Sequence, residues 1–294
     1  MSQASRRSVS SSSGSSESAL RGLLEHHPLW SAVVLVLAVK FWLIVTASVS
    51  TAAFLDVSLP ALAGARVLAE LAVALVLYFV LQRKGWAHLV GFRGAGQWRE
   101  TWLIWLPSLY VLVNLSRLIR LPLNEASPLE MLPAQFSTAL STALMEETLF
   151  RGLVLAVLLN RYHSTRAQVA GCVLFAGILF GAWHASPIVA LVLGVAPPHF
   201  HWETAIAQVV YPVFAGVGLA GVVLRTRSMW LLVGVHALIL IALACASVLT
   251  NADTDANTAP WEGAVFSVLI SLPLLLYGLY LLRDIKRLDL NFPH

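Results

Sequence analysis

Eight apolar stretches, each about as long as a bilayer's hydrocarbon core is thick, constrain this chain more than any other feature. They span residues 29–55, 59–81, 101–118, 136–159, 167–186, 205–224, 229–249 and 264–282. A helix crosses a membrane with about 20 mostly apolar residues, because each residue adds about 1.5 Å. Since 58% of the 294 residues are hydrophobic and 12% are charged, an ordinary soluble domain is excluded. We predict an all-α polytopic membrane protein with about eight transmembrane helices.

The two ends of the chain differ in composition from this apolar centre. Residues 1–27 are rich in serine and poor in apolar side chains, which favours a disordered cytoplasmic tail. We predict a transmembrane helical domain at 28–283 and a short cytoplasmic tail at 284–294. Cys172 and Cys245 both fall in apolar stretches, so they predict neither a disulfide nor a metal pair.

The basic residues indicate how the helices are oriented. With eight spans, every second connection lies on the same side of the membrane as both termini. Most Lys and Arg residues share that side: Arg6, Arg7, Arg21, Arg83, Lys84, Arg93, Arg99, Arg161, Arg166, Arg225, Arg227, Arg283, Lys286 and Arg287. Loops rich in Lys and Arg stay in the cytoplasm, so we predict two cytoplasmic termini in a multi-pass protein of the cell membrane. The lipid bilayer is therefore a partner, and the net charge of +4 does not imply nucleic acid.

The fourth apolar stretch carries three charges where apolar side chains are expected, Glu146, Glu147 and Arg151. An ionised side chain at the bilayer centre costs about 2.5–3.5 kcal/mol even by the lower estimates, so these groups need partners inside the protein. Glu147 and Arg151 are four residues apart with the acid first, which allows them to pair on one helical face. Glu146 points about 100° away and has no obvious local partner. It is either a candidate general base or part of a structural ion cluster.

Three further charges fall inside predicted spans. Arg66 and Glu70 are four residues apart and predict a structural ion pair. Lys40 stands alone, and we expect its side chain to reach a neighbouring acid or carbonyl group.

The spacing of Glu146, Glu147 and Arg151 inside a membrane helix resembles the first motif of the CAAX prenyl endopeptidase and bacteriocin-processing family of intramembrane proteases. The resemblance extends over about residues 136–249. It implies that Arg151 neutralises Glu147 and sets the register of the helix.

Two later stretches resemble the second and third motifs of this family. Phe180 and His184 stand four residues apart in the fifth stretch, where Gly177 and Gly181 also allow another helix to approach closely. His236 lies early in the seventh stretch, after a basic segment that contains Ser and Trp. The resemblance implies that both histidines belong to the catalytic site and that Phe180 packs the wall of its pocket.

One position departs from the family pattern. An Asn or Asp is expected four residues after the third-motif histidine, whereas this chain has Leu240. A leucine side chain neither donates nor accepts a hydrogen bond, so any polarisation that this position provides in relatives is absent or comes from elsewhere.

Depth in the membrane offers a check that does not depend on the resemblance. Glu146 lies about 15–20 Å below the outer end of its helix, and His236 lies about 20 Å below the outer end of its own. His184 would sit near the outer boundary if its helix stopped at Ser186. It meets the other two only if the helix continues through Pro187, kinked there, or if the helices are tilted or staggered.

Two chemistries suit a carboxylate and two imidazoles in a buried cavity. In the first, Glu146 and His184 hold and deprotonate a water that attacks a peptide carbonyl, while His236 stabilises the oxyanion. In the second, the same three side chains bind Zn²⁺ and Glu147 is the base. The chain has no His-Glu-x-x-His motif, so we favour the version without metal slightly.

The resemblance implies an intramembrane endopeptidase that cuts the C-terminal tail or a membrane segment of a protein substrate. Relatives include proteases of prenylated proteins, so a lipidated substrate is among the expectations. Leu240 favours a second hypothesis, a catalytically impaired relative that acts as a membrane partner, immunity protein or chaperone. Buried Glu and His also build proton relays, but the halves of this chain show no repeat that would support a transporter.

Overall fold

A computed structural model describes residues 27–53, 59–92, 98–120, 129, 132–196, 200–249 and 260–283. Helices and turns make up these segments, and no β-strand occurs among them. The longer helices are α2 (Pro28–Ala53), α3 (Leu59–Arg83), α4 (Trp105–Leu115), α6 (Leu132–Glu147), α8 (Arg166–Trp183), α10 (Trp202–Thr226), α11 (Met229–Leu249) and α12 (Pro260–Leu281). The shorter ones are η1 (Trp98–Ile104), α5 (Arg117–Arg120), η3 (Thr148–Val154), α7 (Leu155–Arg161) and α9 (Ser186–Val192). The predicted all-α class is confirmed.

Among the described residues, six helices are long and apolar enough to cross a membrane, namely α2, α3, α8, α10, α11 and α12. The other two predicted stretches are also helical, but each is divided. One consists of η1 followed by α4, and the other of α6, η3 and α7 in direct succession. A polytopic helical membrane protein is confirmed, whereas the number of crossings and their orientation stay predictions. The predicted tails, 1–27 and 284–294, lie outside the described residues except for His27.

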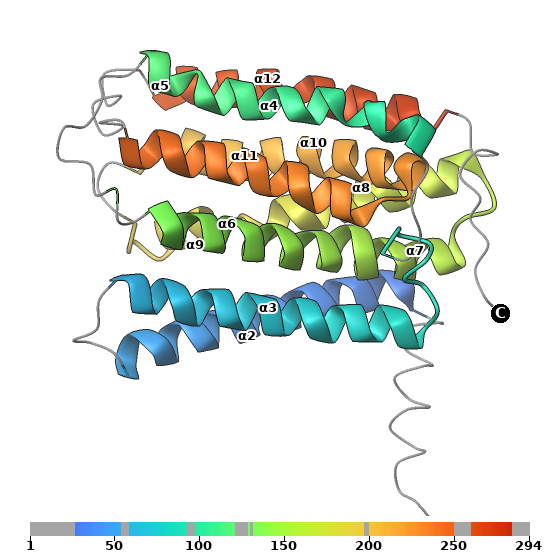
Figure 1. Cartoon of the computed structure of the whole chain (residues 1–294), viewed down its shortest axis with the longest axis horizontal. Helices are drawn as coiled ribbons and strands as arrows, with labels where there is room; N and C mark the ends of the chain where they lie inside the picture. Colours follow the sequence, from blue (N-terminus) through green and yellow to red (C-terminus); the bar gives the residue numbers. More distant parts are fainter. Residues whose placement is uncertain are drawn as a thin grey trace, which may run out of the picture.

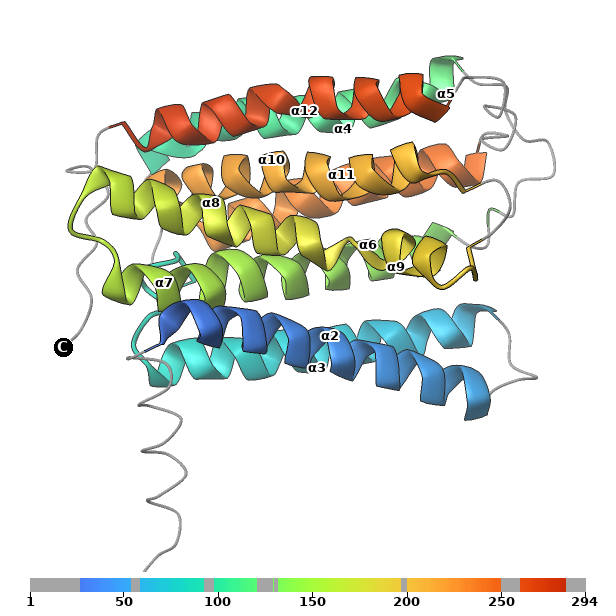
Figure 2. The same cartoon turned by 180° about the vertical axis from the view of Figure 1, so that it is seen from behind.

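The helices lie nearly side by side in one bundle (Figure 1). Seen from both sides, α2 and α3 form one edge, α4 and α12 form the opposite edge, and α6, α8, α10 and α11 lie between them (Figure 2). The inner helices connect the edges, because α6 packs against α3 and α11, while α10 packs against α8 and α12. The charged stretch of the sequence therefore lies inside the bundle.

Glycines allow α8, α10 and α12 to pack closely. A Cβ atom at Gly181 would lie 2.6 Å from the carbonyl oxygen of Val209 in α10, and one at Gly221 would lie 2.8 Å from the Cα atom of Gly278 in α12. Real Cβ atoms do not approach other atoms so closely. The predicted close approach at Gly177 and Gly181 is thus present, and α10 is the helix that approaches. The same end of α8 carries Phe180 and Trp183, whose rings pack against Phe150 of η3.

The helix that carries the acids changes its winding directly after them. From Thr148 to Val154 it forms a π-helix, and all seven residues of this segment are buried. The sequence predicted one uninterrupted span over 136–159 and gave no signal for the wider winding. π-Helical segments occur mostly inside α-helices and often at functional sites. Here the segment contains Arg151, the base of the predicted ion pair.

Candidate active site

Glu147 is the centre of a buried charge network that joins two helices. Its Oε1 accepts a hydrogen bond from Arg151 Nη1 at 3.0 Å and another from His236 Nδ1 of α11 at 2.6 Å. Glu147 is fully buried, and Arg151 is only 1% exposed, so neither charge is solvated by water. The predicted pairing of Glu147 and Arg151 is confirmed. Because a carboxylate only accepts hydrogen bonds, Nδ1 of His236 must carry a proton, and Nε2 is the nitrogen left for other contacts.

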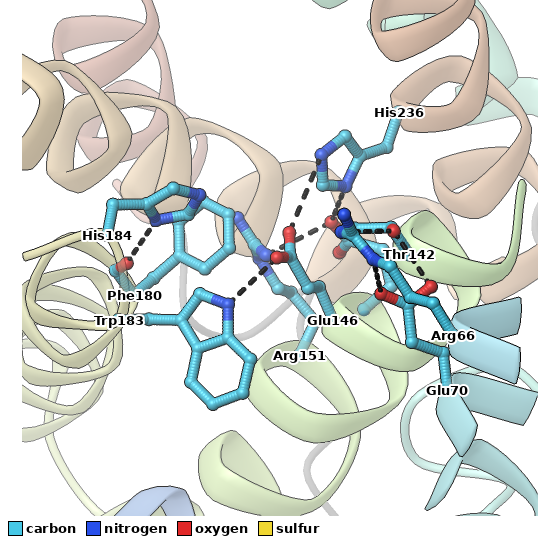
Figure 3. Close-up of polar contacts among 10 residues, drawn as sticks. Arg66, Glu70, Thr142, Glu146, Arg151, Phe180, Trp183, His184 and His236 are labelled. Atoms are coloured by element: carbon cyan, nitrogen blue, oxygen red, sulfur yellow. Dashed lines mark hydrogen bonds and ion pairs between the residues drawn. The ribbon is translucent and has the colours of Figure 1, made fainter. Parts of the chain in front are cut away.

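Glu146 faces the other side of His236. Its Oε1 accepts a hydrogen bond from the indole Nε1 of Trp183 at 2.9 Å, and its Oε2 lies 3.9 Å from His236 Nε2 (Figure 3). This distance is too long for a direct hydrogen bond. One oxygen atom of a water or a substrate beside the gap can contact both groups. The sequence predicted that Glu146 and His236 lie at similar depths in the membrane, and their side chains do approach each other in the structure.

Aromatic side chains cover the buried charges. The guanidinium carbon of Arg151 lies 4.1 Å from the centroid of the Phe180 ring, close enough for a cation–π interaction. Phe180 also packs edge-to-face against Phe150, with 5.0 Å between the ring centroids. Trp183 contacts Phe150 in the same way at 5.7 Å. These rings exclude water from one side of the network and strengthen its electrostatic interactions.

The site falls within a segment that matches a known family. Residues 128–242 match the family model for Type II CAAX prenyl endopeptidase Rce1-like proteins. This segment is less than half of the 294 residues, and over it the chain is similar to CAAX prenyl endopeptidases. The match supports a CAAX-type intramembrane endopeptidase within a multi-pass membrane protein. No curated protein and no solved structure matches the chain.

The family segment starts shortly before α6 and ends within α11, so it contains every predicted site residue. It does not include α2, α3 or α12. Any contribution of these helices to the site is therefore a property of this chain that the family match does not describe.

His184 is the predicted site residue that the structure does not pair with Glu146, Glu147 or His236. α8 ends one residue before it, and its Nδ1 donates a hydrogen bond to the carbonyl oxygen of Phe180 at 2.8 Å. The ring of Phe180 contacts both imidazoles, with centroid distances of 4.9 Å to His184 and 6.3 Å to His236. The helix is interrupted there and resumes as α9, with Pro187 in its first turn. The helix thus continues beyond Ser186, as the comparison of membrane depths required. The break nevertheless leaves the half-buried His184 without an ion pair to Glu146 among the described residues.

The donor atoms do not form a metal site in this arrangement. Within the described part of the chain, no three side chains of His, Cys, Asp and Glu lie close enough together to hold a metal ion. Of the set Glu146, His184 and His236, only the first and third approach each other. A catalytic zinc site has three protein ligands. The residues in this arrangement therefore do not fit Zn²⁺.

Sequence reasoning missed the partner of Glu146. Trp183 is only 7% exposed, and a buried indole N–H needs an acceptor, which was the available signal. Lys40 was predicted to reach an acid or a carbonyl group, and it donates a hydrogen bond to the carbonyl oxygen of Trp183 at 3.0 Å. Its Nζ also lies 4.4 Å from the centroid of the same indole ring. Lys40 of α2 thus helps to hold the residue that orients Glu146.

A second polar cluster lies close to the site (Figure 3). Glu70 Oε1 accepts from Arg66 Nε at 2.8 Å, as the spacing predicted. Glu70 Oε2 accepts from Ser141 Oγ at 2.6 Å and from Thr142 Oγ1 at 2.9 Å. Arg66, Glu70 and Glu146 all line one groove with a volume of about 360 Å³ between α2, α3, α6 and α8. The carboxylate of Glu146 is therefore accessible from this groove.

Proposed function

We propose that the chain hydrolyses a peptide bond in the C-terminal tail or a membrane segment of a protein substrate, with Glu146 as the general base. The observation that carries this proposal is the gap of 3.9 Å between Glu146 Oε2 and His236 Nε2, beside a groove of about 360 Å³ that Glu146 lines. A water beside this gap contacts both a proton acceptor and an imidazole nitrogen.

We propose a different task for each carboxylate, and their hydrogen bonds support this division. Trp183 holds Oε1 of Glu146, so Oε2 is left to take the proton from the water. The resulting hydroxide attacks the peptide carbonyl carbon. Glu147 holds the imidazole of His236 from its far side and stabilises the protonated ring. With His236 protonated, Glu146, Glu147, Arg151 and His236 carry two charges of each sign, so the buried cluster is neutral.

The protonated imidazole acts on the carbonyl oxygen of the substrate. Its Nε2–H donates a hydrogen bond to the oxyanion that forms there, which stabilises the tetrahedral intermediate. When the C–N bond breaks, the leaving nitrogen takes the proton that Glu146 received from the water. Nε2 of His184 makes no hydrogen bond to another described residue, and we propose that it contacts the substrate.

Peptide cleavage by the purified protein tests this function. A panel of prenylated peptides and C-terminal membrane-tail peptides is incubated with wild-type protein, with Glu146→Gln, and with Glu203→Gln, which changes an exposed carboxylate in the same way. We expect cleavage by the wild type and by Glu203→Gln, and none by Glu146→Gln. Cleavage that persists in Glu146→Gln would refute the role of the general base. Repeating the assay with a chelator distinguishes glutamate chemistry from metal chemistry, and we expect no loss.

Leu240 favours one second candidate, a non-enzymatic membrane partner. This residue is half-buried, one helical turn beyond His236 on α11, where it offers no hydrogen bond. The substitution Leu240→Asn supplies one. If wild-type protein cleaves no peptide while Leu240→Asn does, the leucine has impaired an enzyme, and the native chain acts by binding.

A further inference from the structure

Lys40 is a cation inside a membrane helix that the hydrolytic mechanism does not use. It is half-buried in α2 and lines the groove beside the candidate active site, together with Glu146 and Trp183. Charged side chains at membrane depth are rare, and they usually bond each other or backbone carbonyl groups and have a function. Within the described part of the chain, no carboxylate lies within ion-pairing distance of Lys40. Its contacts are therefore to be found elsewhere, and both that the structure shows are with Trp183.

The carbonyl oxygen of Trp183 lies at the end of α8, where the helix cannot satisfy it. In a continuous α-helix the N–H group four residues later donates to this oxygen, but that residue is Pro187, which has no N–H. Lys40 Nζ donates to the oxygen instead, at 3.0 Å. A cation is also favoured at this place, because the C-terminus of a helix carries a partial negative charge. The ammonium group of α2 thus caps α8 at the residue that contacts Glu146.

The indole of Trp183 contacts opposite charges at two places. Lys40 Nζ lies 4.4 Å from the centroid of the ring. Glu146 Oε1 accepts a hydrogen bond from the indole Nε1 at 2.9 Å (Figure 3). The face of an aromatic ring is negative and its edge is positive, so each charge contacts the part of the indole that attracts it. The cation polarises the ring and makes its N–H a stronger donor to the carboxylate.

The other cation of the groove, Arg66, is not equivalent to Lys40. Its Nε donates to Glu70 at 2.8 Å, and its Nη2 donates to Thr142 at 3.3 Å. The side chain is 59% exposed. Arg66 thus forms its ion pair within α3, whereas Lys40 connects α2 to the end of α8.

We propose that Lys40 is a positioning residue, which holds Trp183 from its backbone and from its ring face and thereby keeps Glu146 oriented toward the attacking water. The inference rests on the proposed role of Glu146 as the general base and adds a residue to that site. Lys40 lies outside the segment that matches the family, so the comparison does not describe this role. Because Lys40 contacts neither the water nor the substrate, its loss should lower kcat and leave KM nearly unchanged.

Nuclear magnetic resonance tests the positioning without requiring hydrolysis. The full chain in detergent micelles, with ¹⁵N-labelled tryptophan, gives one indole signal for each of its ten tryptophans, and Trp183→Phe identifies the signal of Trp183. In Lys40→Met we expect hydrogen exchange of this indole N–H to accelerate about tenfold, because the bond to Glu146 opens more often. Lys40→Arg, which keeps a cation and its donors, should exchange nearly as slowly as the wild type. An unchanged exchange rate in Lys40→Met would overturn the proposal.

Lys84→Met is the matched control for this measurement. Lys84 is also half-buried, and its Nζ lies 6.0 Å from the centroid of another indole ring, that of Trp86. The substitution therefore removes an ammonium group beside a tryptophan that does not contact Glu146. The exchange of Trp183 should stay unchanged in Lys84→Met. An acceleration equal to that in Lys40→Met would show that the effect does not depend on the contacts of Lys40.

Kinetics test whether this orientation matters for the reaction. Lys40→Met should lower kcat for a cleaved peptide about tenfold, and Lys40→Arg should restore most of it. If Lys40 acts through Trp183, then Lys40→Met combined with Trp183→Phe should be about as slow as either single variant, since both remove the same contact to Glu146. Independent effects would instead multiply to about a hundredfold loss. A hundredfold loss, or a loss confined to KM, would overturn the proposal.

The two measurements together separate failure of the positioning role from failure of the proposed function. If the wild type cleaves no peptide, the proposed function fails, and the exchange of the Trp183 N–H still decides whether Lys40 holds the indole. Faster exchange in Lys40→Met with an unchanged kcat would overturn the positioning role and leave the function intact. A melting curve of each variant confirms that the compared preparations are equally folded.

Discussion

Two ion pairs lie close together in this bundle, and in each the acid and the base stand four residues apart on one helix. They differ in the order of the two charges, in exposure and in hydrogen bonding. In the pair of Glu147 and Arg151 the acid comes first, and both side chains are at most 1% exposed. In the pair of Arg66 and Glu70 the base comes first, and the arginine is 59% exposed while the acid is buried. The same spacing thus produces one sealed pair and one pair that opens into a groove.

The hydrogen bonds of the two pairs differ just as clearly. Both oxygens of Glu70 are occupied, by Arg66, Ser141 and Thr142. By contrast, Glu147 Oε2 and two guanidinium nitrogens of Arg151 have no hydrogen-bond partner among the described residues. A fully satisfied cluster holds its members in one geometry, whereas an incompletely satisfied one costs stability and persists where chemistry requires it. The contrast supports assigning catalysis to the network of Glu147 and Arg151 rather than to the pair of Arg66 and Glu70.

The largest expected effect comes from the carboxylate beside the sealed pair. Glu146→Gln should lower kcat/KM for a cleaved peptide by about 10² to 10⁴, the usual contribution of a general base. The amide oxygen can still accept the hydrogen bond from Trp183, so the thermal unfolding temperature should change little. Steady-state kinetics and a melting curve of the same preparation check both statements. A loss of activity that merely followed a loss of folded protein would contradict the assignment.

The next effect separates the two pairs by stability. Arg151→Leu removes one of the two buried cations and leaves an uncompensated negative charge in the cluster, so it should lower the free energy of unfolding by about 3–5 kcal/mol. Arg66→Leu removes a largely exposed cation and should cost about 1 kcal/mol or less, because water screens that pair. Chemical unfolding in detergent micelles measures both values. Similar losses for the two variants would mean that the difference in exposure has no energetic consequence.

A smaller effect is expected at the residue that orients Glu146. Trp183→Phe keeps an aromatic ring against Phe150 but removes the indole N–H that binds Glu146 Oε1. We expect kcat to fall about tenfold, which corresponds to about 1.4 kcal/mol, with little change in KM. Trp230→Phe, at an exposed indole in the first turn of α11, serves as the control. An equal loss in both variants would show that the hydrogen bond is not responsible.

The smallest effect concerns the satisfied cluster. Thr142→Val keeps the shape of the side chain but removes the hydroxyl that bonds Glu70 Oε2 and Arg66 Nη2. The expected loss is about 1 kcal/mol in the free energy of unfolding, since Ser141 and Arg66 still satisfy the acid. Thr148→Val, whose hydroxyl bonds only the carbonyl oxygen of Leu144, should cost less. Equal costs would indicate that Glu70 does not depend on Thr142.

Particular residues show where sequence reasoning succeeded. The ion pairs at Glu147 and Arg66 follow from helical spacing, and the structure contains both. The approach of Glu146 to His236 follows from equal depth in two membrane helices, which limits where their side chains can meet. His184 shows the limit of the same argument, because α8 ends directly before it. Depth in the membrane also does not determine the direction in which its imidazole points.

The sequence by itself determined the apolar helices and the charges that they bury, since both depend on neighbours within a few residues along the chain. Only the tertiary structure decided that Glu146 binds an indole 37 residues away and that Glu147 binds an imidazole 89 residues away. It also decided that Lys40 and Arg66 share a groove with Glu146. Helix packing makes these contacts. The packing depends on side-chain volumes and on glycines that let helices approach closely, and it involves several helices at once. The hydrophobic periodicity of a single segment does not contain this information.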